Sequence, residues 1–512
     1  MALTLATPLV MAPQTGRAQP APARRQPAPV REPVPPQTET QPPGREITLP
    51  QVLEHAVRHS PDLAAAQIDI TIAEASVLEA TGISDLVLIA NGSYLRRKTE
   101  TQSGGLTGDD SSTRYSGQVG LSQLIPTGGR LSLTADGDRT RRKSSFFGSG
   151  VEHTTAVNLQ LEQPLLRGFG STVTYQAETR AKVARDAATL ERDAAARTMV
   201  RELVSAYWDL AYAIADLEIR RSSVDLARER RRLTEASARG GAVAPTEVLA
   251  VDQVIASREE EVVAAELSVL ERSLALRRLA GMEIGPGELA LSVTAPLEVD
   301  PKAPEVDPIV AAAFQASPEI AALEARGRGA KLEIEVTENG LLPRLDLRAF
   351  GGPLGADNKF ADAVKETAEF EGYQVGADLE LEYAFGRNAA KGSNRRARAE
   401  RERLMVNIAD VRAQIAQAAV QAVALARSAE KRLALSRTAI ELSEKNIKAE
   451  TGRFELGKST NFDVLLRQDE LKQARLRYAR AVADYLRATA AIGALTGEIL
   501  PQYGIKIESP KK

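Results

Sequence analysis

The feature that most constrains this chain is a run without Gly or Pro from Thr172 to Arg239. A second long run of this kind spans Ser393–Thr451, and shorter ones span Thr246–Ala280 and Lys458–Ile492. Because Gly and Pro are the residues that most often interrupt a helix, each run predicts one continuous helix. At about 1.5 Å per residue, the first helix would reach roughly 100 Å. No compact globular domain needs such a helix, so the chain is predicted to be elongated and mainly α.

The second long run also carries the repeat of a coiled coil. Its apolar residues recur at alternating steps of four and three: Leu404, Ile408, Val411, Ile415, Ala418, Ala422, Leu425 and Ala429. This 3.5-residue period predicts a seam along which helices pack. Charged residues fill the other faces, as expected for a solvated surface or an aqueous lumen. Periodicity alone would equally fit an ordinary coiled-coil scaffold.

The chain consists of two copies of one pattern. Three segments recur in the same order: His59–Ala65 with Ala316–Ala322, Leu159–Glu162 with Leu379–Glu382, and Gly241–Gly281 with Gly457–Gly497. The last pair aligns without a gap. Pro61 and Pro318 lie 257 residues apart, whereas Leu159 and Leu379 lie only 220 apart, so the first copy holds 37 more residues between these landmarks. That is enough for one additional β-hairpin.

Between the helices, short stretches alternate strictly between apolar and polar residues. The clearest are Val157–Glu162, Leu345–Ala349 and Val375–Tyr383. A period of two places the apolar set on one face of a strand and the polar set on the other. An apolar face toward lipid and a polar face toward water is typical of the wall of a transmembrane β-barrel. A soluble sandwich would show the same alternation, but so few strands beside such long helices favour the barrel.

Six strands are expected per chain. They lie near 85–96, 115–124, 129–138 and 154–163 in the first copy, and near 342–350 and 373–384 in the second. The connections near 99–113 and 140–152 are polar and rich in Gly and Ser, so we expect extracellular loops there, and a polar loop between the last two strands. So few strands cannot close a membrane barrel alone, which predicts that several chains share one.

Composition argues against several classes of function. The chain has no cysteine, which excludes disulfides, cysteine zinc ligands and cysteine nucleophiles. A net charge of -2 gives no global field that would attract nucleic acid. His55 and His59 have a spacing that can bind a metal, but an exposed helix face explains the pair equally well. The sequence has no P-loop, G-x-S-x-G or dinucleotide fingerprint, so we expect no enzyme, no metal site and no cofactor.

The duplicated order of elements resembles the TolC-like outer-membrane efflux family, the outer membrane factors, over roughly residues 46–500. Gln163–Gly170 is similar to the family's junction from the last strand into the long helix. Arg453–Leu465 is similar to its periplasmic helix-turn-helix tip, and Ala238–Gln253 is a weaker first-copy version. No single motif is decisive, but the duplicated set in this order is highly specific.

The resemblance implies a domain plan. A possible signal peptide at 1–20 and a Pro-rich linker at 21–45 come first. The first repeat, 46–281, has strands about 85–163 and tunnel helices about 172–280, and an equatorial linker at 282–308 follows it. The second repeat, 309–497, has strands about 342–384 and tunnel helices about 393–492, and a C-terminal tail at 498–512 ends the chain. The apolar start, Ala2–Pro13, resembles the middle of a signal peptide but lacks a basic beginning.

The resemblance also implies a homotrimer that forms one continuous tube. A β-barrel would lie in the outer membrane of a Gram-negative bacterium, in contact with its lipid, and a helical tunnel would extend into the periplasm. Such ducts are passive exits for efflux or type I secretion. They work with a periplasmic adaptor and an inner-membrane pump of the resistance-nodulation-division or ABC type, which supplies the energy. The alternative function is a soluble coiled-coil scaffold with a small β domain.

The number of barrel strands is where this chain departs from the family pattern. The usual barrel takes four strands per chain and twelve per trimer. An added hairpin would give six per chain and eighteen per trimer, and it would keep the direction of every later strand. The other arrangement, in which the hairpin lies outside the barrel wall, also stays open at this point.

By resemblance, the tips of the long helices close the periplasmic end. Asp463 matches a position that lines the constriction, Leu466 would form an apolar ring, and Glu247 is the first-copy counterpart of Asp463. Three such carboxylates around a three-fold axis would select cations and raise each other's pKa. The alternative role is helix capping, because Thr460 and Asp463 have the spacing of a capping box and acids favour the first turn. Both roles can coexist.

The turns at the two tips are also candidate binding surfaces. Gly241 and Gly457 are expected to permit the tight turns between antiparallel helices. The candidate adaptor contacts are these two glycines and their neighbours Val243, Ala244, Lys458, Ser459 and Thr460. The other interpretation, that these neighbours are merely solvated turn residues, weighs the same.

Overall fold

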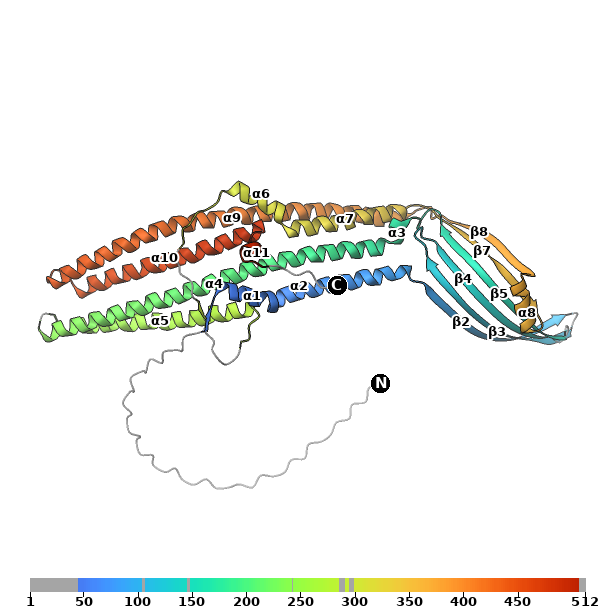
Figure 1. The fold of residues 1–512 in the computed structure, drawn as a ribbon, viewed down its shortest axis with the longest axis horizontal. Helices are drawn as coiled ribbons and strands as arrows, with labels where there is room; N and C mark the ends of the chain where they lie inside the picture. The colour runs from blue at the N-terminus through green and yellow to red at the C-terminus, as the bar shows by residue number, and fades with distance from the viewer. Residues whose placement is uncertain are drawn as a thin grey trace, which may run out of the picture. The chain divides into compact units, whose positions relative to one another are not determined.

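A computed structural model describes residues 45–103, 106–144, 148–241, 243–284, 291–293 and 299–505 (Figure 1). The chain separates into two compact units, Met1–Pro42 and Pro43–Lys512. The described residues all belong to the second unit. The possible signal peptide, nearly all of the Pro-rich linker and the end of the C-terminal tail therefore lie outside the described residues.

Each copy begins with two short helices that meet at a Ser-Pro step. In the first copy they are α1 (Leu49–His59) and α2 (Pro61–Thr81), and in the second they are α6 (Val306–Ala316) and α7 (Pro318–Asn339). Proline disfavours a helical conformation in the residue before it and is itself suited to the first helical position. Accordingly Ser60 is extended with ψ 125° and Ser317 with ψ 114°. The repeat seen in the sequence is thus a repeat of structure.

Two long antiparallel hairpins form most of the helical part. They consist of α4 (Gln176–Arg239) with α5 (Thr246–Leu279), and of α9 (Asn388–Glu455) with α10 (Asn461–Thr496). The short helices α3 (Ser171–Thr174) and α11 (Ile499–Gln502) flank them. Helix α10 packs against α4 as well as α9, and α2 and α7 pack against α4 (Figure 1). Among the described helices, none combines the length and the low polarity needed to cross a lipid bilayer.

The main core lies midway along the helices. Val200, Leu203 and Leu210 of α4 are fully buried there, together with Val52 of α1 and Leu276 of α5. Burying one such side chain contributes about 1.5–3 kcal/mol. Beside this core, β1 (Arg45–Ile47) pairs in parallel with β6 (Leu291–Val293). The core therefore anchors the N-terminal segment and the linker between the copies to the long helices.

The coiled-coil seam expected in the second long helix is wrong at two positions, whereas Ala422 and Ala429 are buried as predicted. Ala418 is exposed and Leu425 is 51% exposed. The buried stripe runs instead through Ala419, Ala422, Ala426, Ala429 and Leu433. An α-helix with 3.6 residues per turn drifts from a 3.5 repeat by about 20° per heptad. Helix α9 also packs against α6, α7 and α10, so no single seam fits its whole length.

One antiparallel sheet joins the two copies. Its strands are β2 (Val87–Ser103), β3 (Leu106–Leu124), β4 (Arg130–Ser144), β5 (Gly148–Pro164), β7 (Arg344–Asp357) and β8 (Gly372–Glu382), in that spatial order. The pairing of β5 with β7 connects the first copy to the second. All six expected strands lie in one sheet, which confirms that the additional hairpin belongs to the sheet.

Two expectations about the connections are wrong. The segments near 99–113 and 140–152, expected as loops, lie largely in strands, because β2 pairs with β3 to Ser103 and β4 with β5 to Ser144. Ser, Thr and Arg there are compatible with a hydrogen-bonded ladder whose two faces are both polar, which hides the strand pattern. The expected polar loop between β7 and β8 contains a helix, α8 (Phe360–Glu369), whose Ala363 and Thr367 are buried.

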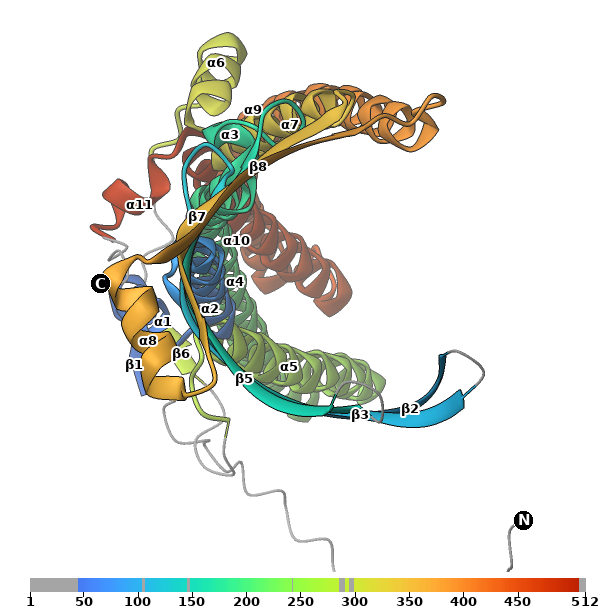
Figure 2. The ribbon, with the colours of Figure 1, turned by 90° about the vertical axis from the view of Figure 1, so that its right-hand side faces the viewer.

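The sheet is curved, and its two faces differ in chemistry. Leu121, Leu133 and Leu159 are cross-strand neighbours on one face and are 41–51% exposed. Thr155 lies on the same face as Leu159 and hydrogen-bonds to α8, and Figure 2 shows α8 on the convex side. The convex face is therefore the apolar one.

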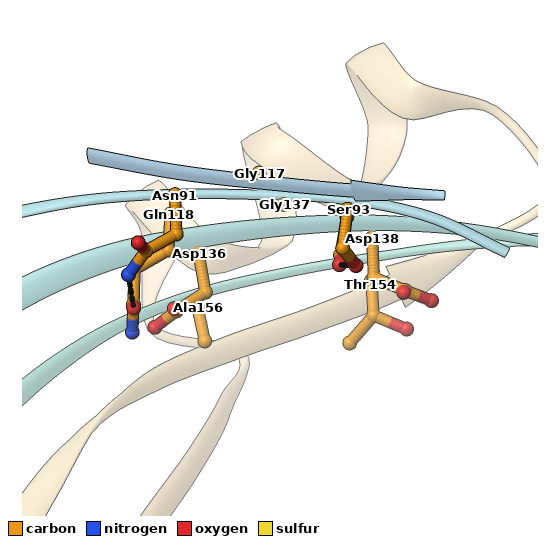
Figure 3. A pocket seen from close by; sticks show the side chains of 10 residues that line it. Asn91, Ser93, Gly117, Gln118, Asp136, Gly137, Asp138, Thr154 and Ala156 are labelled. Carbon is orange, nitrogen blue, oxygen red and sulfur yellow. Dashed lines mark hydrogen bonds between the residues drawn. The ribbon is translucent and has the colours of Figure 1, made fainter. Parts of the chain in front are cut away.

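The opposite, concave face is polar. Figure 3 shows a hollow on this face lined by side chains from β2 to β5. Asn91 donates a hydrogen bond to Gln118 at 3.2 Å, and the hydroxyls of Ser93 and Ser116 lie 2.6 Å apart. A sheet that is apolar outside and polar inside is the arrangement that alternation in the sequence predicts for a barrel wall.

Candidate functional site at the helical tips

Each long hairpin turns at a glycine with a left-handed backbone. The φ angle is 74° at Gly241 and 68° at Gly457, a region that glycine enters without steric cost. At the second tip, the amide of Gly457 donates to the carbonyl of Phe454 and that of Lys458 donates to Arg453, both at 2.9 Å. These two bonds form a Schellman motif, which satisfies the free carbonyls at the end of α9. Both tips lie at the end of the helices that is remote from the sheet (Figure 1).

Helix α10 starts with a complete capping box. The amide of Asp463 donates to the Thr460 hydroxyl at 3.3 Å, and the amide of Thr460 donates to Asp463 Oδ2 at 3.1 Å. The Thr460 hydroxyl also donates to that oxygen at 2.7 Å. Ser459 donates a weaker bond of 3.4 Å to Asp463 and a short one to Glu450 of α9. The capping role of Asp463 is therefore present in the protomer.

The same bonds set the acidity of Asp463. The hydrogen bond from the Thr460 hydroxyl, followed by that from the Thr460 amide, lowers the pKa of the Asp463 carboxyl below its usual range. Hydrogen bonds to the ionised form stabilise it, which is the physical cause of this direction. A ring of three carboxylates would instead raise the pKa of Asp463, because like charges disfavour ionisation. The two candidate roles therefore predict opposite shifts of this pKa.

The first tip is built differently. Helix α5 begins at Thr246 with Pro245 as its N-cap, so the proline stands one position before the first helical residue. No side-chain capping bond forms there; the amide of Glu247 donates to the carbonyl of Ala244 at 3.0 Å. Proline has no side-chain oxygen with which to cap a helix. The first tip is therefore closed by backbone bonds alone among the described residues.

Three side chains link the two hairpins close to their tips. Arg230 Nε of α4 donates to Asn461 Oδ1 at 2.8 Å, and the Thr234 hydroxyl donates to the same oxygen at 3.1 Å. The Asn461 amide in turn donates to Glu247 Oε2 at 3.5 Å, a long bond. We call Arg230, Thr234 and Asn461 the tip link. Through Asn461 it brings Glu247 of the first tip to the beginning of α10.

Arg230 is an unusual member of this link because its charge is buried. Its side chain lies beneath the Phe454 ring, with 3.7 Å from Cζ to the ring centroid, and it is only 5% exposed. Burial lowers the pKa of its guanidinium, and nearby Glu455 opposes this. Its Nη2 has no hydrogen-bond partner among the described residues. A buried cation with incomplete hydrogen bonding is held by its surroundings at a cost in free energy.

A second layer of charges connects the hairpins farther from the tips. Lys472 of α10 is 5% exposed and binds Glu261 of α5 at 3.0 Å and Asp469 at 2.7 Å. Arg220 of α4 binds the same Glu261 and also Asp216, both at 2.8 Å. This network spans three helices and keeps the buried ammonium of Lys472 paired, which a buried charge requires.

The remaining candidate residues lie at the tip surface. Leu466 is 42% exposed in the protomer, one helical turn after Asp463. Lys458 and Ala244 are exposed, whereas Val243 is partly buried. Large apolar side chains are also exposed nearby, with Leu456 at 72% and Phe462 at 71%. Apolar exposure of this size at a helical end is typical of a surface that contacts another chain.

The tip link was not predicted from the sequence. Arg230 stands among Arg228, Arg231 and Arg232, so its charge suggested a solvated face. The signal that could have identified it is helical phase. Val224, Ala227, Arg230 and Thr234 step by three, three and four, which places Arg230 on the stripe that includes buried apolar residues.

The histidine pair that could have formed a metal site makes ordinary contacts. His55 Nδ1 lies 3.2 Å from the carbonyl of Ala280, and His59 Nδ1 lies 3.0 Å from that of His55. The two rings stack with centroids 4.3 Å apart. Among the described residues, no group of three potential ligands lies close enough to hold a metal ion.

Comparison with known proteins identifies the family. Residues 130–282 and 309–498 match the family described as outer membrane efflux protein. The fold is similar to that of the outer-membrane channel OprN, with a TM-score of 0.64, 18% identity, and coverage of 88% of this chain and 90% of that chain. For VceC of Vibrio cholerae the values are 0.63, 17%, 88% and 96%, and for CmeC of Campylobacter jejuni they are 0.64, 14%, 90% and 87%. No curated protein matches the chain by sequence. The chain belongs to the outer membrane efflux protein family, whose channels lie in the outer membrane with a tunnel that extends into the periplasm.

Proposed function

We propose that this protein is a passive exit duct, through which the substrates of an efflux or type I secretion system leave the cell. The observation that carries the proposal is the sheet with an apolar convex face and a polar concave face, continued by helices of up to 68 residues. Such a wall separates lipid from water. A conduit of this kind performs no chemistry, and its energy comes from a partner pump, so we propose neither catalysis nor a cofactor.

Three copies would form the duct. Strands β2 and β8 are the edges of the six-stranded sheet, and unpaired edges are a liability that barrel closure removes. Pairing of β2 with β8 of the next copy would give eighteen strands and a barrel about 36 Å wide, against about 24 Å for twelve strands. The family match begins at residue 130, so the hairpin β2–β3 lies outside it. Helices α1 and α2 also precede residue 130, but the 37 additional residues of the first copy lie between Pro61 and Leu159, which supports β2–β3 as the hairpin that widens the barrel.

The tips of the hairpins would close the periplasmic end. Asp463 and Leu466 would form an acidic and an apolar ring around the axis, with Glu247 beside them. The bond between Asn461 and Glu247 supports this proposal, because it joins the two tips at this level. The tip link would hold the closed state, and opening would require Arg230 to leave its place beneath Phe454.

The outer surface of the tips would receive the periplasmic adaptor, which connects the duct to an inner-membrane pump of the resistance-nodulation-division or ABC type. The proposed contacts are Gly241, Val243, Ala244, Gly457, Lys458, Ser459 and Thr460. Exposed Lys458 and the exposed apolar side chains of Leu456 and Phe462 support a protein contact there.

Single-particle imaging of protein purified from isolated outer membranes tests the duct. We expect a hollow three-fold tube with eighteen strands in its barrel, and stepwise ion conductance after insertion into planar lipid bilayers. A rod found in the soluble fraction, with no conductance, would leave the alternative of a coiled-coil scaffold. A three-fold tube with twelve strands would keep the duct but overturn the role of β2–β3.

A further inference from the structure

The convex face of the sheet changes character along its strands. Next to the rows of leucine, valine and alanine lies a pair of tyrosines, Tyr94 of β2 and Tyr115 of β3, which are cross-strand partners with ring centroids 5.1 Å apart. Both rings are more than half exposed. Tyrosine is enriched where a barrel wall leaves the hydrocarbon core and enters the headgroups. These tyrosines therefore mark the membrane boundary at the end of the sheet away from the helices.

Four cations lie at and just beyond this boundary on the same face. They are Arg96 of β2 and Arg139, Arg141 and Lys143 of β4, which we call the basic belt. Arg96 and Arg141 both pair with Thr113 of the strand between them, so their backbones are about 10 Å apart. Successive members along β4 are about 7 Å apart. The belt is thus a compact surface and not a scatter of charges.

The basic belt has no acidic partners among the residues that the structure describes. Its four members are exposed and form no ion pair with any described residue. Cations close to them in the sequence behave differently on the concave face, where Arg114 binds Asp138 at 2.9 Å and Arg142 lies 3.9 Å from Glu152. Lys98 of the convex face is paired with Asp109 and is not counted in the belt. Arg97 of the concave face also forms no ion pair with a described residue, so four of the five unpaired cations of β2 to β4 at this level lie on the face that meets lipid.

We propose that the basic belt binds the phosphate groups of anionic glycolipid headgroups in the outer leaflet of the outer membrane. The position suits this ligand, because phosphates lie just outside the hydrocarbon core, at the level that follows the tyrosines. Arginine binds phosphate through two parallel hydrogen bonds, and two neighbouring arginines can share a doubly phosphorylated headgroup. The long stems of these side chains can also lie along the apolar boundary.

Helix α8 explains why the belt occupies β2 to β4. The helix covers the convex face of β5 and β7 at a neighbouring level, where Thr155 donates to Ala363 at 2.9 Å (Figure 2). Between the tyrosines and the apolar rows, Cβ atoms added to Gly92 and Gly117 would meet no protein atom. The part of the wall that carries the basic belt is thus open to lipid. The proposal depends on the location of the protein in the outer membrane and not on what the duct transports.

Two matched double variants test the proposal. The variant R96Q/R141Q removes two charges from the convex face, and R97Q/R142Q removes two charges from the adjacent positions on the concave face. Native mass spectrometry of the full-length protein in neutral detergent would measure binding of lipid A with two phosphates, and of lipid A stripped of both. At about fivefold per cation near a lipid surface, the first variant should bind the doubly phosphorylated lipid roughly 25-fold more weakly. The second should stay within about twofold of the wild type.

A charge-restoring variant and controls for folding complete the test. The variant R96K/R141K should recover most of the binding, because it restores the charge, and all variants should keep the helical signal and the oligomeric mass of the wild type. Equal loss in the convex-face and concave-face variants would overturn the proposal. So would equal binding of phosphorylated and phosphate-free lipid to the wild-type protein. Loss of oligomeric mass in R96Q/R141Q shifts the test to the single variant R139Q, for which about fivefold weaker binding is expected and unchanged binding is contradictory.

Discussion

The two hairpin tips occupy equivalent places in a duplicated pattern, yet they are closed by different bonds. Thr460 and Asn461 of the second tip correspond to Ala244 and Pro245 of the first. The second tip therefore has a side-chain capping box, and the side-chain oxygen of Asn461 accepts from Arg230, whereas helix α5 has no side-chain cap and Pro245 has no side-chain oxygen. The difference shows that the copies have specialised, so that the second tip is ordered by its own side chains.

The two copies also contribute differently to the tip link, but here the first copy supplies the side chains that the second lacks. Its donors, Arg230 and Thr234, come from the first copy, and their second-copy counterparts are Asn446 and Glu450. Asn446 is exposed, and Glu450 accepts a bond from Ser459 inside its own hairpin. Each copy thus supplies half of one contact.

The largest expected effect comes from breaking the link at Arg230. The variant Arg230→Ala removes a buried charge-assisted hydrogen bond and the contact with Phe454, so we expect a loss of on the order of 2 kcal/mol in the free energy of unfolding. Single-channel recordings in planar bilayers should show a higher conductance of the resting channel. The counterpart variant Asn446→Ala should change neither quantity. Wild-type conductance in Arg230→Ala, with the protein folded, would remove the tip link from the gate.

Two glycines at the second tip, five residues apart, are expected to change stability in opposite directions when each is replaced by alanine. Gly457 has a positive φ, so Gly457→Ala should destabilise the protein by about 1 kcal/mol. Gly452 lies within α9, and a Cβ there would meet no atom within 4 Å, so Gly452→Ala should stabilise by up to about 1 kcal/mol. Thermal denaturation measures both. Gly241→Ala should resemble Gly457→Ala, and a difference between them would show that the tips also differ in their turns.

Removing the capping hydroxyl tests the specialisation of the second tip directly. The variant Thr460→Ala should cost about 1 kcal/mol in stability, the usual value for loss of a threonine N-cap. The reciprocal variant Ala244→Thr should give almost nothing, because Pro245 and not residue 244 is the N-cap of α5. Chemical denaturation compares the two. A gain in Ala244→Thr as large as the loss in Thr460→Ala would show that the tips remain interchangeable.

The sequence predicted those parts of the fold that depend on local pattern. Uninterrupted runs identified α4, α5, α9 and α10, and alternation identified six strands in which the apolar face of β5 is the convex one. It failed where structure depends on pairing between distant segments. The extensions of β2 to β5 have two polar faces, so alternation gives no signal there, and α8 is held by Thr155, which lies some 200 residues earlier.

In the candidate site, too, only the features that depend on local sequence were predicted. The capping box of Thr460 and Asp463 is local, and the spacing in the sequence suggested it correctly. The tip link joins residues more than 220 positions apart, and a charge buried under an aromatic ring cannot be distinguished from a solvated one by composition. Helical phase would have placed Arg230 on the buried stripe, but it would not have identified Asn461 as its partner.

The smallest expected effect is the pH dependence of stability that Asp463 causes, and it distinguishes the two roles proposed for this residue. Hydrogen bonds from Thr460 lower its pKa in the folded protomer. This stabilisation is present above the unfolded value of about 3.9 and is lost as the pH falls through the lower, folded value. The stability difference between wild type and Asp463→Ala should therefore be constant from pH 7 to about pH 5 and shrink below about pH 4.

If a ring of three carboxylates dominates instead, the folded pKa lies above the unfolded value and the sign reverses. Acidification from pH 6 to about pH 4 would then stabilise the wild type relative to Asp463→Ala, because protonation relieves the repulsion between the carboxylates. The variant Asp463→Asn distinguishes the two roles at neutral pH, since it keeps an oxygen for the capping box and removes the charge. It should be less stable than the wild type if capping by the ionised carboxylate dominates, and more stable than the wild type if the acidic ring does. Either result decides whether the specialised second tip serves mainly to order α10 or mainly to place charge on the axis of the duct.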